Sequence, residues 1–530
     1  MTMHTTKARW RHVARGTVAL ALAGLATSSV SAAATPPSEK AVPRAHCGPG
    51  ALPETAAQGR IPAADYTSGR AAKGYLCNTR EVSHVASTAG LKVFRYVDKS
   101  GHACAYYDST QFFPTDALAN LNKDGLGVFV LDMTNPAKPK KTANLTTPAM
   151  LTPHESLQLN QKRGLLVAVA GNAVTEPGVV DVYDLTQDCR HPQWQSSTPL
   201  GVLGHESAIA PDGLTFYASS TYGSIVAAVD LTDPKLPSLL WVKLGAIYHG
   251  MSVSDDGKRL YAANDSVSNL SLDILDVSQI QARTPAPQVS VISNLTWPSV
   301  SIPQVPLPFT VKGHRYLLEV DEFNKPSGEV GAARIIDIRD DRHPFVTSNI
   351  RLEVHQPANR TGTSQQTDPG APESPYGGYT AHYCSLPRRD NPGLAACSFI
   401  GSGLRLFDIR DPQHPREAGY FNMPSSKGSH AMSAPAWDAA HGQVWYSDSN
   451  SGFYAVQLTN GLTKLLNPAT AAVTPATGSH PSSSPTTARS ANSGALAATG
   501  LPARMTVLAV LLLTVSGATR TRRVRAGLLA

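Results

Sequence analysis

The chain contains 530 residues, of which 42% are hydrophobic, and it carries a formal net charge of +7. Nine positive charges and no acidic residue lie in residues 1–34 and 500–530, so subtracting nine from +7 leaves about −2 for the rest. Because the basic character belongs to the two ends of the chain, we expect no nucleic-acid partner.

Residues 1–34 have the order of a secretory signal peptide. The apolar run VALALAGLA and the small residues SSVSAAA follow a basic segment that contains Lys7, Arg9, Arg11 and Arg15. An amphipathic first helix fits less well, since no polar residue interrupts the apolar run. We therefore predict export by the general secretory route, with cleavage just after Ala32 or Ala34.

Six cysteines form an even set, which favours disulfides in an exported chain. They are Cys47, Cys77, Cys104, Cys189, Cys384 and Cys397. The last two flank a turn-rich segment of twelve residues, so we predict that they bridge it. The other four allow three connectivities, of which we prefer Cys77 with Cys104 and Cys47 with Cys189. We interpret residues 35–74 as a disulfide-held N-terminal extension. The segment from His46 to Tyr107 is expected to pack against, and to complete, the first repeat.

Residues 75–462 contain a recurring strand that ends in an aspartate and runs into a proline-containing turn. The aspartates are Asp132, Asp184, Asp230, Asp276, Asp337 and Asp408. A seventh, degenerate copy has Gln457 in the place of the aspartate. Short alternating apolar segments precede each copy, and a unit of this kind cannot bury both sheet faces alone. Radial stacking buries them, so the sequence predicts an all-β fold, a seven-bladed β-propeller.

The repeated phrase is clearest in GLRLFDIRDPQHP, and it resembles the LVIVD-repeat family of propeller proteins. An aspartate at a strand end can accept backbone N–H bonds in the turn that follows, while the proline fixes φ. We therefore interpret the recurring aspartates as structural. Calcium ligands would require clustered carboxylates rather than one in each blade.

Histidine also recurs, at the start of the first strand in five units. These residues are His154, His205, His249, His382 and His430. Their spacings of 51, 44, 133 and 48 residues match one, one, three and one repeat periods. First strands line the central channel of a propeller, so the five imidazoles are predicted to form a ring, helped by Glu155 and Glu206. Such a ring would suit copper or zinc.

Two interpretations of the ring stay open. Propellers of the selenium-binding protein and methanethiol oxidase group carry a comparable scatter of histidines, which is an analogy and not a motif match. In WD-type propellers, by contrast, a recurrent Gly-His pair only bonds to neighbouring blade residues, and the LGH at 203–205 resembles that pair. His84, His314 and His355 are less convincing members of a ring.

Signals for conventional enzyme chemistry are poor, because no GxSxG, P-loop, HExxH or GxGxxG motif stands in a suitable context. The HES sequences at 154–156 and 205–207 combine an imidazole, a carboxylate and a hydroxyl. Neighbouring residues on a strand point to opposite faces, so neither sequence forms a catalytic triad locally.

Residues 463–495 are rich in proline, threonine, serine and alanine, and they predict a disordered stalk. Residues 496–530 then combine the pentapeptide LAATG, an apolar run and a final cluster of four arginines, Arg520, Arg522, Arg523 and Arg525. This order resembles the cell-wall sorting signal of Gram-positive bacteria, in the LAxTG form associated with class E sortases of actinobacteria. The apolar run, Met505–Ala518, is shorter than the roughly 20 residues of a transmembrane helix.

The resemblance implies a specific cleavage within the pentapeptide Leu496, Ala497, Ala498, Thr499 and Gly500. A sortase cysteine would attack the Thr499 carbonyl, release Gly500 onward and transfer the new acyl end to a peptidoglycan amine. The alternative is a C-terminal membrane anchor whose arginines stay inside the cell.

The sequence thus predicts a secreted, wall-anchored propeller with helical targeting segments at its two ends. Its expected role is a surface binding or interaction module, with a protein, glycan or small molecule as ligand. The alternative is an extracytoplasmic copper- or zinc-dependent propeller enzyme, of oxidase type, that uses the channel histidines. The expected processing partners are a sortase and peptidoglycan.

Overall fold

The computed structural model describes residues 37–111, 120–121, 124–170, 178–200, 204–220, 224–323, 330–359 and 378–466. The chain divides into two compact units, Met1–Ala469 and Thr470–Ala530, and the described residues all belong to the first. The predicted signal peptide and sorting signal, with Leu496, Ala497, Thr499 and Gly500, lie outside the described residues.

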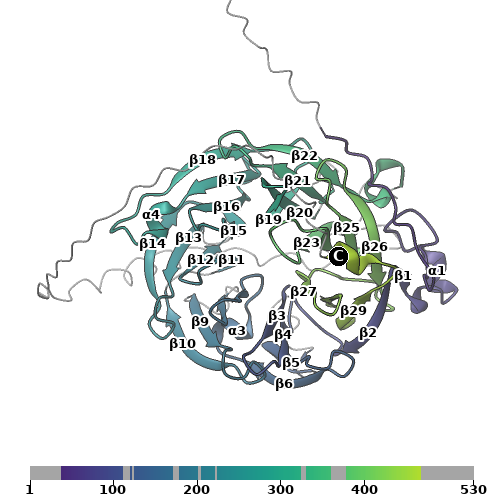
Figure 1. The fold of residues 1–530 in the computed structure, drawn as a ribbon, viewed down its shortest axis with the longest axis horizontal. Coiled ribbons are helices and arrows are strands. Elements are labelled where there is room, and N and C mark those ends of the chain that lie inside the picture. The colour runs from purple at the N-terminus through teal and green to yellow at the C-terminus, as the bar shows by residue number, and fades with distance from the viewer. Residues whose placement is uncertain are drawn as a thin grey trace, which may run out of the picture. The chain divides into compact units, whose positions relative to one another are not determined.

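Seven antiparallel sheets stand around a central axis, which confirms the predicted seven-bladed propeller (Figure 1). Blades 1 to 4 have four strands each, which follow one another from the axis outwards. Blade 1 contains β3 (Val93–Val97), β4 (Ala103–Asp108), β5 (Val128–Asp132) and β6 (Lys140–Leu145), and blade 2 contains β7 (Gln158–Asn160), β8 (Leu165–Val169), β9 (Val179–Asp184) and β10 (Gln193–Pro199). Blade 3 contains β11 (Glu206–Ile209), β12 (Thr215–Ser220), β13 (Ile225–Asp230) and β14 (Ser238–Leu244), and blade 4 contains β15 (Tyr248–Val253), β16 (Arg259–Asn264), β17 (Ser271–Asp276) and β18 (Ser290–Leu295).

Blades 5 to 7 continue the ring, and blades 6 and 7 each include a strand from the N-terminal part of the chain. Blade 5 contains β19 (Ile302–Val311), β20 (His314–Glu322), β21 (Ala333–Asp337) and β22 (Phe345–Ile350). Blade 6 contains β23 (Ala381–Ser385), β24 (Leu394–Phe399), β25 (Gly403–Asp408), β26 (Arg416–Asn422) and β1 (Tyr75–Cys77). Blade 7 contains β27 (Ala436–Asp438), β28 (Gln443–Asp448), β29 (Gly452–Leu458) and β2 (Thr79–Val85). The described helices are short: α1 (Ala63–Thr67), α3 (Pro148–Leu151), α4 (Ser278–Gln281), and the 3-10 turns η1 (Ala71–Lys73), η3 (Glu353–His355), η4 (Pro357–Asn359), η6 (Ile400–Ser402) and η7 (Leu462–Leu465).

The N-terminal part of the chain closes the ring at its last blade. Strand β2 pairs antiparallel with β29, from Thr79 opposite Leu458 to Val85 opposite Phe453. Strand β1 adds a fifth strand to blade 6 by pairing with β26. Residues 93–107, at the end of the segment expected to complete the first blade, do form strands there, whereas residues 75–85 join blades 6 and 7. Blade 1 obtains all four strands from residues 93–145, and the free edge of the sheet lies at the other end of the repeat array.

Each of the seven boundaries between neighbouring blades contains its own hydrophobic cluster. On β5, Val130 packs in the cluster shared with blade 2, while its neighbour Phe129 packs with Trp445 of blade 7. Successive side chains of a strand point to opposite faces, so a blade buried on both faces needs a continuous apolar strand. This requirement explains the uninterrupted apolar runs of the repeats.

The recurring aspartates form the turns that the sequence predicts. In all six, Oδ1 accepts the backbone N–H of the residue two positions later, at distances between 2.7 and 3.2 Å. The predicted structural role of these aspartates at the ends of the third strands is confirmed.

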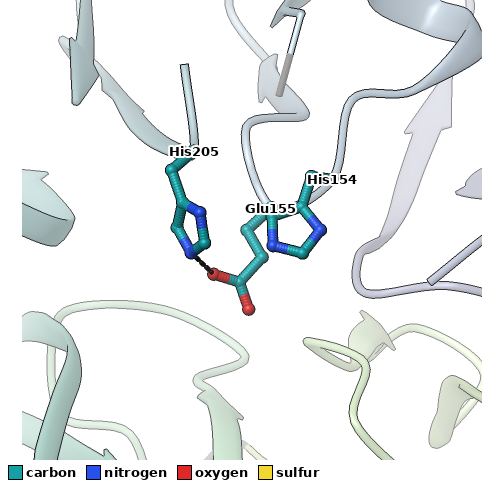
Figure 2. Close-up of side chains that lie close together, drawn as sticks. All are labelled: His154, Glu155 and His205. Carbon is teal, nitrogen blue, oxygen red and sulfur yellow. Dashed lines mark ion pairs between the residues drawn. The ribbon is translucent and has the colours of Figure 1, made fainter. Parts of the chain in front are cut away.

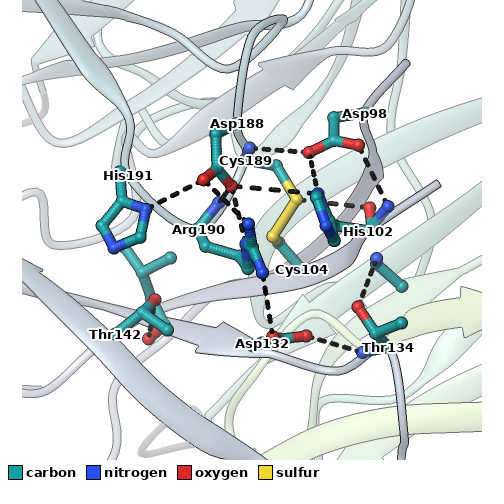
Figure 3. The surroundings of a disulfide bond; sticks show 12 residues. Asp98, His102, Cys104, Asp132, Thr134, Thr142, Asp188, Cys189, Arg190 and His191 are labelled. Carbon is teal, nitrogen blue, oxygen red and sulfur yellow. Dashed lines mark hydrogen bonds and ion pairs between the residues drawn. A yellow bond between two sulfur atoms is a disulfide. The ribbon is translucent and has the colours of Figure 1, made fainter. Parts of the chain in front are cut away.

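Three disulfides join all six cysteines: Cys47–Cys77, Cys104–Cys189 and Cys384–Cys397. The predicted hairpin bridge, Cys384–Cys397, is confirmed, because these residues are direct partners in the β23–β24 pair. The other two predicted pairings are wrong. Cys104 on β4 meets Cys189, which follows β9, across the boundary between blades 1 and 2 (Figure 3). The two cysteines pair because the packing of neighbouring blades brings them together, and their distance along the sequence does not predict this contact.

Candidate metal centre

The inner strands of the blades begin at one end of the propeller axis, and each has a polar residue at or just before its start. From blade 1 to blade 7 these residues are Lys92, Glu155, His205, His249, Gln304, His382 and His430. Each repeat supplies one such position, and closure of the ring brings them together. We call Glu155, His205, His249, Glu322 and His382 the axial cluster.

Glu155 lies at the centre of the axial cluster and is 2% exposed. Its Oε2 lies 3.2 Å from His205 Nε2 and 3.0 Å from His249 Nε2. Its Oε1 lies 3.2 Å from His382 Nε2 and accepts a hydrogen bond of 2.8 Å from Gln304 Nε2. One buried carboxylate thus faces imidazoles from three other blades, and Figure 2 shows the first of these contacts, to His205, beside His154.

Two local backbone features support this convergence. His154 has φ of 49°, in the left-handed region that residues other than glycine seldom adopt, and strain of this kind gathers at functional sites. Gly250 follows His249, and a Cβ there would lie 2.1 Å from the carbonyl oxygen of Gln304. The glycine therefore lets the inner strands of blades 4 and 5 approach closely at the cluster.

Glu322 belongs to the cluster although the sequence pattern did not single it out. Its Oε2 lies 2.9 Å from His382 Nε2, and its Oε1 lies 3.6 Å from His249 Nδ1. Glu322 ends β20, the second strand of blade 5, so a pattern of residues at the start of first strands could not include it. Gln304 was missed because blade 5 has no histidine at the equivalent position.

Backbone carbonyl groups orient the imidazoles. The Nδ1 of His249 donates to the Pro303 carbonyl at 3.1 Å, and the Nδ1 of His382 donates to the Met432 carbonyl at 2.6 Å. His154 Nδ1 bonds the Gln111 carbonyl in the same way, at 3.3 Å. A carbonyl can only accept, so each Nδ1 carries a proton and the Nε2 atoms of His249 and His382 face the carboxylates. Metal-binding histidines are commonly held in this manner.

The buried charges of the cluster shift its pKa values in opposite directions. Burial opposes a charge on His249 and His382, but their contacts with Glu155 and Glu322 raise the pKa of His249 to about 10 and that of His382 to about 9. Burial also works against ionisation of Glu155, yet the bonds from three histidines hold its pKa well below the ordinary value. Burial and the neighbouring His205 lower the pKa of His154 to about 3. Protonated imidazoles or a metal cation would both balance the two carboxylates.

Glu206 and His430 do not join the cluster, in contrast to the prediction. Glu206 accepts bonds from Lys92 Nζ at 2.5 Å and from Tyr383 Oη at 3.0 Å. Glu206 is the first residue of β11 and directly follows His205. Successive side chains along a strand point to opposite faces, so Glu206 points away from the side of His205. His430 lies at the same end of the axis, where its Nδ1 is 2.9 Å from Ser449 Oγ. Burial lowers the pKa of His430 to about 4.

The remaining histidines of interest have structural surroundings. His84 lies on β2, the outermost strand of blade 7, and stacks on Tyr454 at a ring distance of 4.3 Å. His355 bonds the Tyr379 carbonyl at 2.9 Å. Near the disulfide in Figure 3, His102 bonds Asp98, whose carboxylate also accepts the backbone N–H groups of Ser100, His102 and Cys189. Through these hydrogen bonds the Asp98 carboxylate stabilises the local turn.

Comparison with known proteins gives no family: no family description and no curated protein matches the chain. Solved structures resemble it only distantly. Hydrazine synthase of Kuenenia stuttgartiensis is 13% identical, with a TM-score of 0.45, over 71% of this chain and 97% of that one. The propeller domain of Cps50 (Swd1) from Myceliophteria thermophila is 11% identical, with a TM-score of 0.47, over 72% and 100%. At these values the likenesses assign no ligand, substrate or partner.

The three disulfides indicate an oxidising, extracytoplasmic environment. Within the described part of the chain, no helix combines the length and apolar character needed to cross a membrane.

Proposed function

We propose that this protein is an extracytoplasmic propeller that binds a transition metal, copper or zinc, through Glu155, His205, His249 and His382. One observation carries the proposal. Nε2 atoms from three blades converge on one buried carboxylate, while backbone carbonyls hold the Nδ1 atoms of His249 and His382. Imidazole and carboxylate together are the ligands that zinc and copper accept.

The spacing of the ligand atoms supports the same proposal. Two atoms bound at about 2.0–2.1 Å to a tetrahedral zinc ion lie about 3.3 Å apart. The Nε2 atoms of His205 and His249 are 2.9 Å apart, and the contacts of Glu155 with the three histidines measure 3.0–3.2 Å. Small outward movements would admit an ion, and Glu322 and His154 stand beside it as further ligands.

A metal at this position would supply Lewis-acid chemistry or, for copper, redox chemistry. His154 is half-buried, whereas His249 and His382 are 2% and 1% exposed, so a small molecule would approach from the His154 side. We therefore favour the metal-dependent enzyme, of oxidoreductase type, over a plain interaction module.

An interaction module is the second candidate, and one feature of the outer surface supports it. The region around β14 exposes Leu236 and Leu244, each at 75%, together with Leu239 at 45%. Exposed apolar residues on an edge strand favour contact with another protein. In that case the axial cluster would be a buried ion-pair network that fixes the blades.

Metal analysis separates these candidates. The mature chain, purified without added metal, is expected to contain about one equivalent of copper or zinc by mass spectrometry. His205→Ala combined with His382→Ala should abolish it, and His84→Ala is the matched control on the outer strand. A protein that neither retains metal nor changes its melting temperature with added copper or zinc would overturn the proposal.

We also propose that the protein is an LVIVD-type propeller attached to the cell wall by a sortase. The order of signal peptide, stalk, LAATG, apolar run and arginines supports the attachment, and the disulfides support export. Thr499→Ala should leave the protein in the membrane or the medium. Undiminished covalent attachment to peptidoglycan in this variant would contradict the sortase step.

A further inference from the structure

A central channel, distinct from the axial cluster, runs along the inner strands. Its cavity volume is about 700 Å³, and residues from the inner strands of all seven blades line it. This volume falls in the range of about 300–1,000 Å³ that small-molecule sites occupy. The residues that line it include none of the axial cluster, so it is a separate space within the described part of the chain.

Buried polar side chains lie between the channel and the axial cluster. Lys92 and Tyr383 line the channel, and both bond Glu206. Lys92 is 4% exposed and Tyr383 is 1% exposed, and the ammonium group lies 4.6 Å from the centre of the tyrosine ring. Because the two polar groups are paired with Glu206, they do not need a partner from the channel.

The walls beyond these polar side chains are mainly apolar. Ile209, Leu307, Leu386 and Trp437 are half-buried side chains from four different blades, as expected of groups that border an open space. A propeller axis filled by its own side chains would leave no such surface. The walls therefore suit the apolar body of a ligand.

The far end of the channel carries an excess of positive charge. Lys162, Asp255 and Arg389 lie in the turns that follow inner strands, and Arg95 lies on β3. Arg389 pairs with Asp255 at 2.7 Å, and Arg95 pairs with Asp438 at 3.1 Å. Lys162 is exposed and has no ion-pair partner among the described residues. The mouth of the channel thus favours an anionic group.

We propose that this channel binds an organic anion with an apolar body, such as a medium-chain carboxylate. The apolar body lies against Ile209, Leu307, Leu386 and Trp437, and the carboxylate lies at the mouth beside Lys162. The site is independent of the metal proposed at the axial cluster, since it uses the opposite end of the inner strands.

Calorimetry with the full mature chain and three ten-carbon probes tests the proposal. Decanoate is expected to bind saturably at one site. Decan-1-ol should bind up to about fivefold more weakly, because an ion pair at a partly exposed site contributes up to about 1 kcal/mol, and protonated decan-1-amine should bind more weakly still because its charge repels Lys162. Absence of saturable decanoate binding, or equal binding of the amine, would overturn the proposal.

Variants locate the site. Lys162→Glu should weaken decanoate binding about fivefold or more, whereas Lys258→Glu, which changes an exposed lysine outside the lining, should not. Leu307→Trp should fill part of the cavity and abolish binding without changing the metal content. Decanoate binding that survives both Lys162→Glu and Leu307→Trp would place the site elsewhere and refute the assignment.

Discussion

Two residue types recur once in most blades, and they occupy opposite parts of the molecule. The aspartates end the third strands near the outside, where each bonds the backbone two residues ahead. The histidines lie near the starts of the inner strands, where His205, His249 and His382 meet residues from other blades. An aspartate thus acts within its own turn, whereas an axial histidine acts only in the closed ring. The first role can be read from a single repeat, and the second cannot.

Removing the central carboxylate should have the largest effect. Glu155→Gln leaves His249 and His382 without their shared counter-charge, and loss of one member of a buried charge network costs about 3–5 kcal/mol. Denaturant unfolding should show a loss of this size, and the bound metal should disappear. A loss below about 1 kcal/mol would show that the imidazoles do not depend on this carboxylate.

The disulfides repeat the contrast between contacts within one blade and contacts across blades. The Cys104–Cys189 bridge closes 85 residues, and the Cys384–Cys397 bridge closes 13. Loop-closure entropy predicts that replacing the first pair by serine costs about 4.5 kcal/mol and replacing the second about 3 kcal/mol. Thermal unfolding of the two double variants tests the order, and the reverse order would contradict the entropic account.

Loss of Asp230, which ends the third strand of blade 3, should reduce the unfolding free energy less than loss of the axial carboxylate Glu155. Asp230 accepts bonds from the backbone N–H and the hydroxyl of Thr232, at 2.9 and 2.6 Å. Asp230→Ala should therefore cost about 1 kcal/mol of unfolding free energy. The metal content should stay unchanged, because the turn lies away from the axis. A loss of metal in this variant would contradict the separation between the outer aspartate turns and the axial metal site.

The charge of the same aspartate should have a smaller, pH-dependent effect. Burial works to raise the pKa of Asp230, but the bonds from Thr232 and the charge of Arg283 lower it overall. A depressed pKa in the folded state stabilises the protein above the unfolded value of about 3.9, and this contribution is lost as the pH falls. Asp230→Asn keeps the turn, so the variant should be less stable than the wild type by up to about 0.5 kcal/mol at pH 6, and this difference should be smaller at pH 3. Urea titrations at the two pH values measure the difference, and a gap that widened at pH 3 would contradict the sign.

The smallest effect is expected at a histidine outside the axial ring. His84 stacks on Tyr454 at the outer strand of blade 7. Its replacement by alanine should change the unfolding free energy by about 0.5 kcal/mol and leave the metal content intact. Thermal unfolding and metal analysis together provide the check. A metal loss equal to that of His205→Ala would show that position in the ring does not distinguish these histidines.

Several features of the site followed from the spacing of residues in the sequence. Glu155, His205, His249 and His382 are predicted members that lie within 3.2 Å of another member. The prediction of Glu206 fails because strand alternation turns it toward Lys92 and Tyr383. Glu322 escapes the pattern because it comes from a second strand. A periodic pattern identifies a position in the repeat, but it does not state where a side chain points.

The sequence alone determined the number of blades, the aspartate turns and the hairpin disulfide. These features depend on contacts within one repeat or between adjacent strands, so local pattern and turn chemistry are sufficient to define them. Only the tertiary structure decided that β2 closes blade 7, that Cys104 pairs with Cys189, and that Glu155 sits among three imidazoles. The first contact joins residues from the two ends of the repeat array, and the other two join different blades. The geometry of all three is fixed only when seven packed sheets close into one ring.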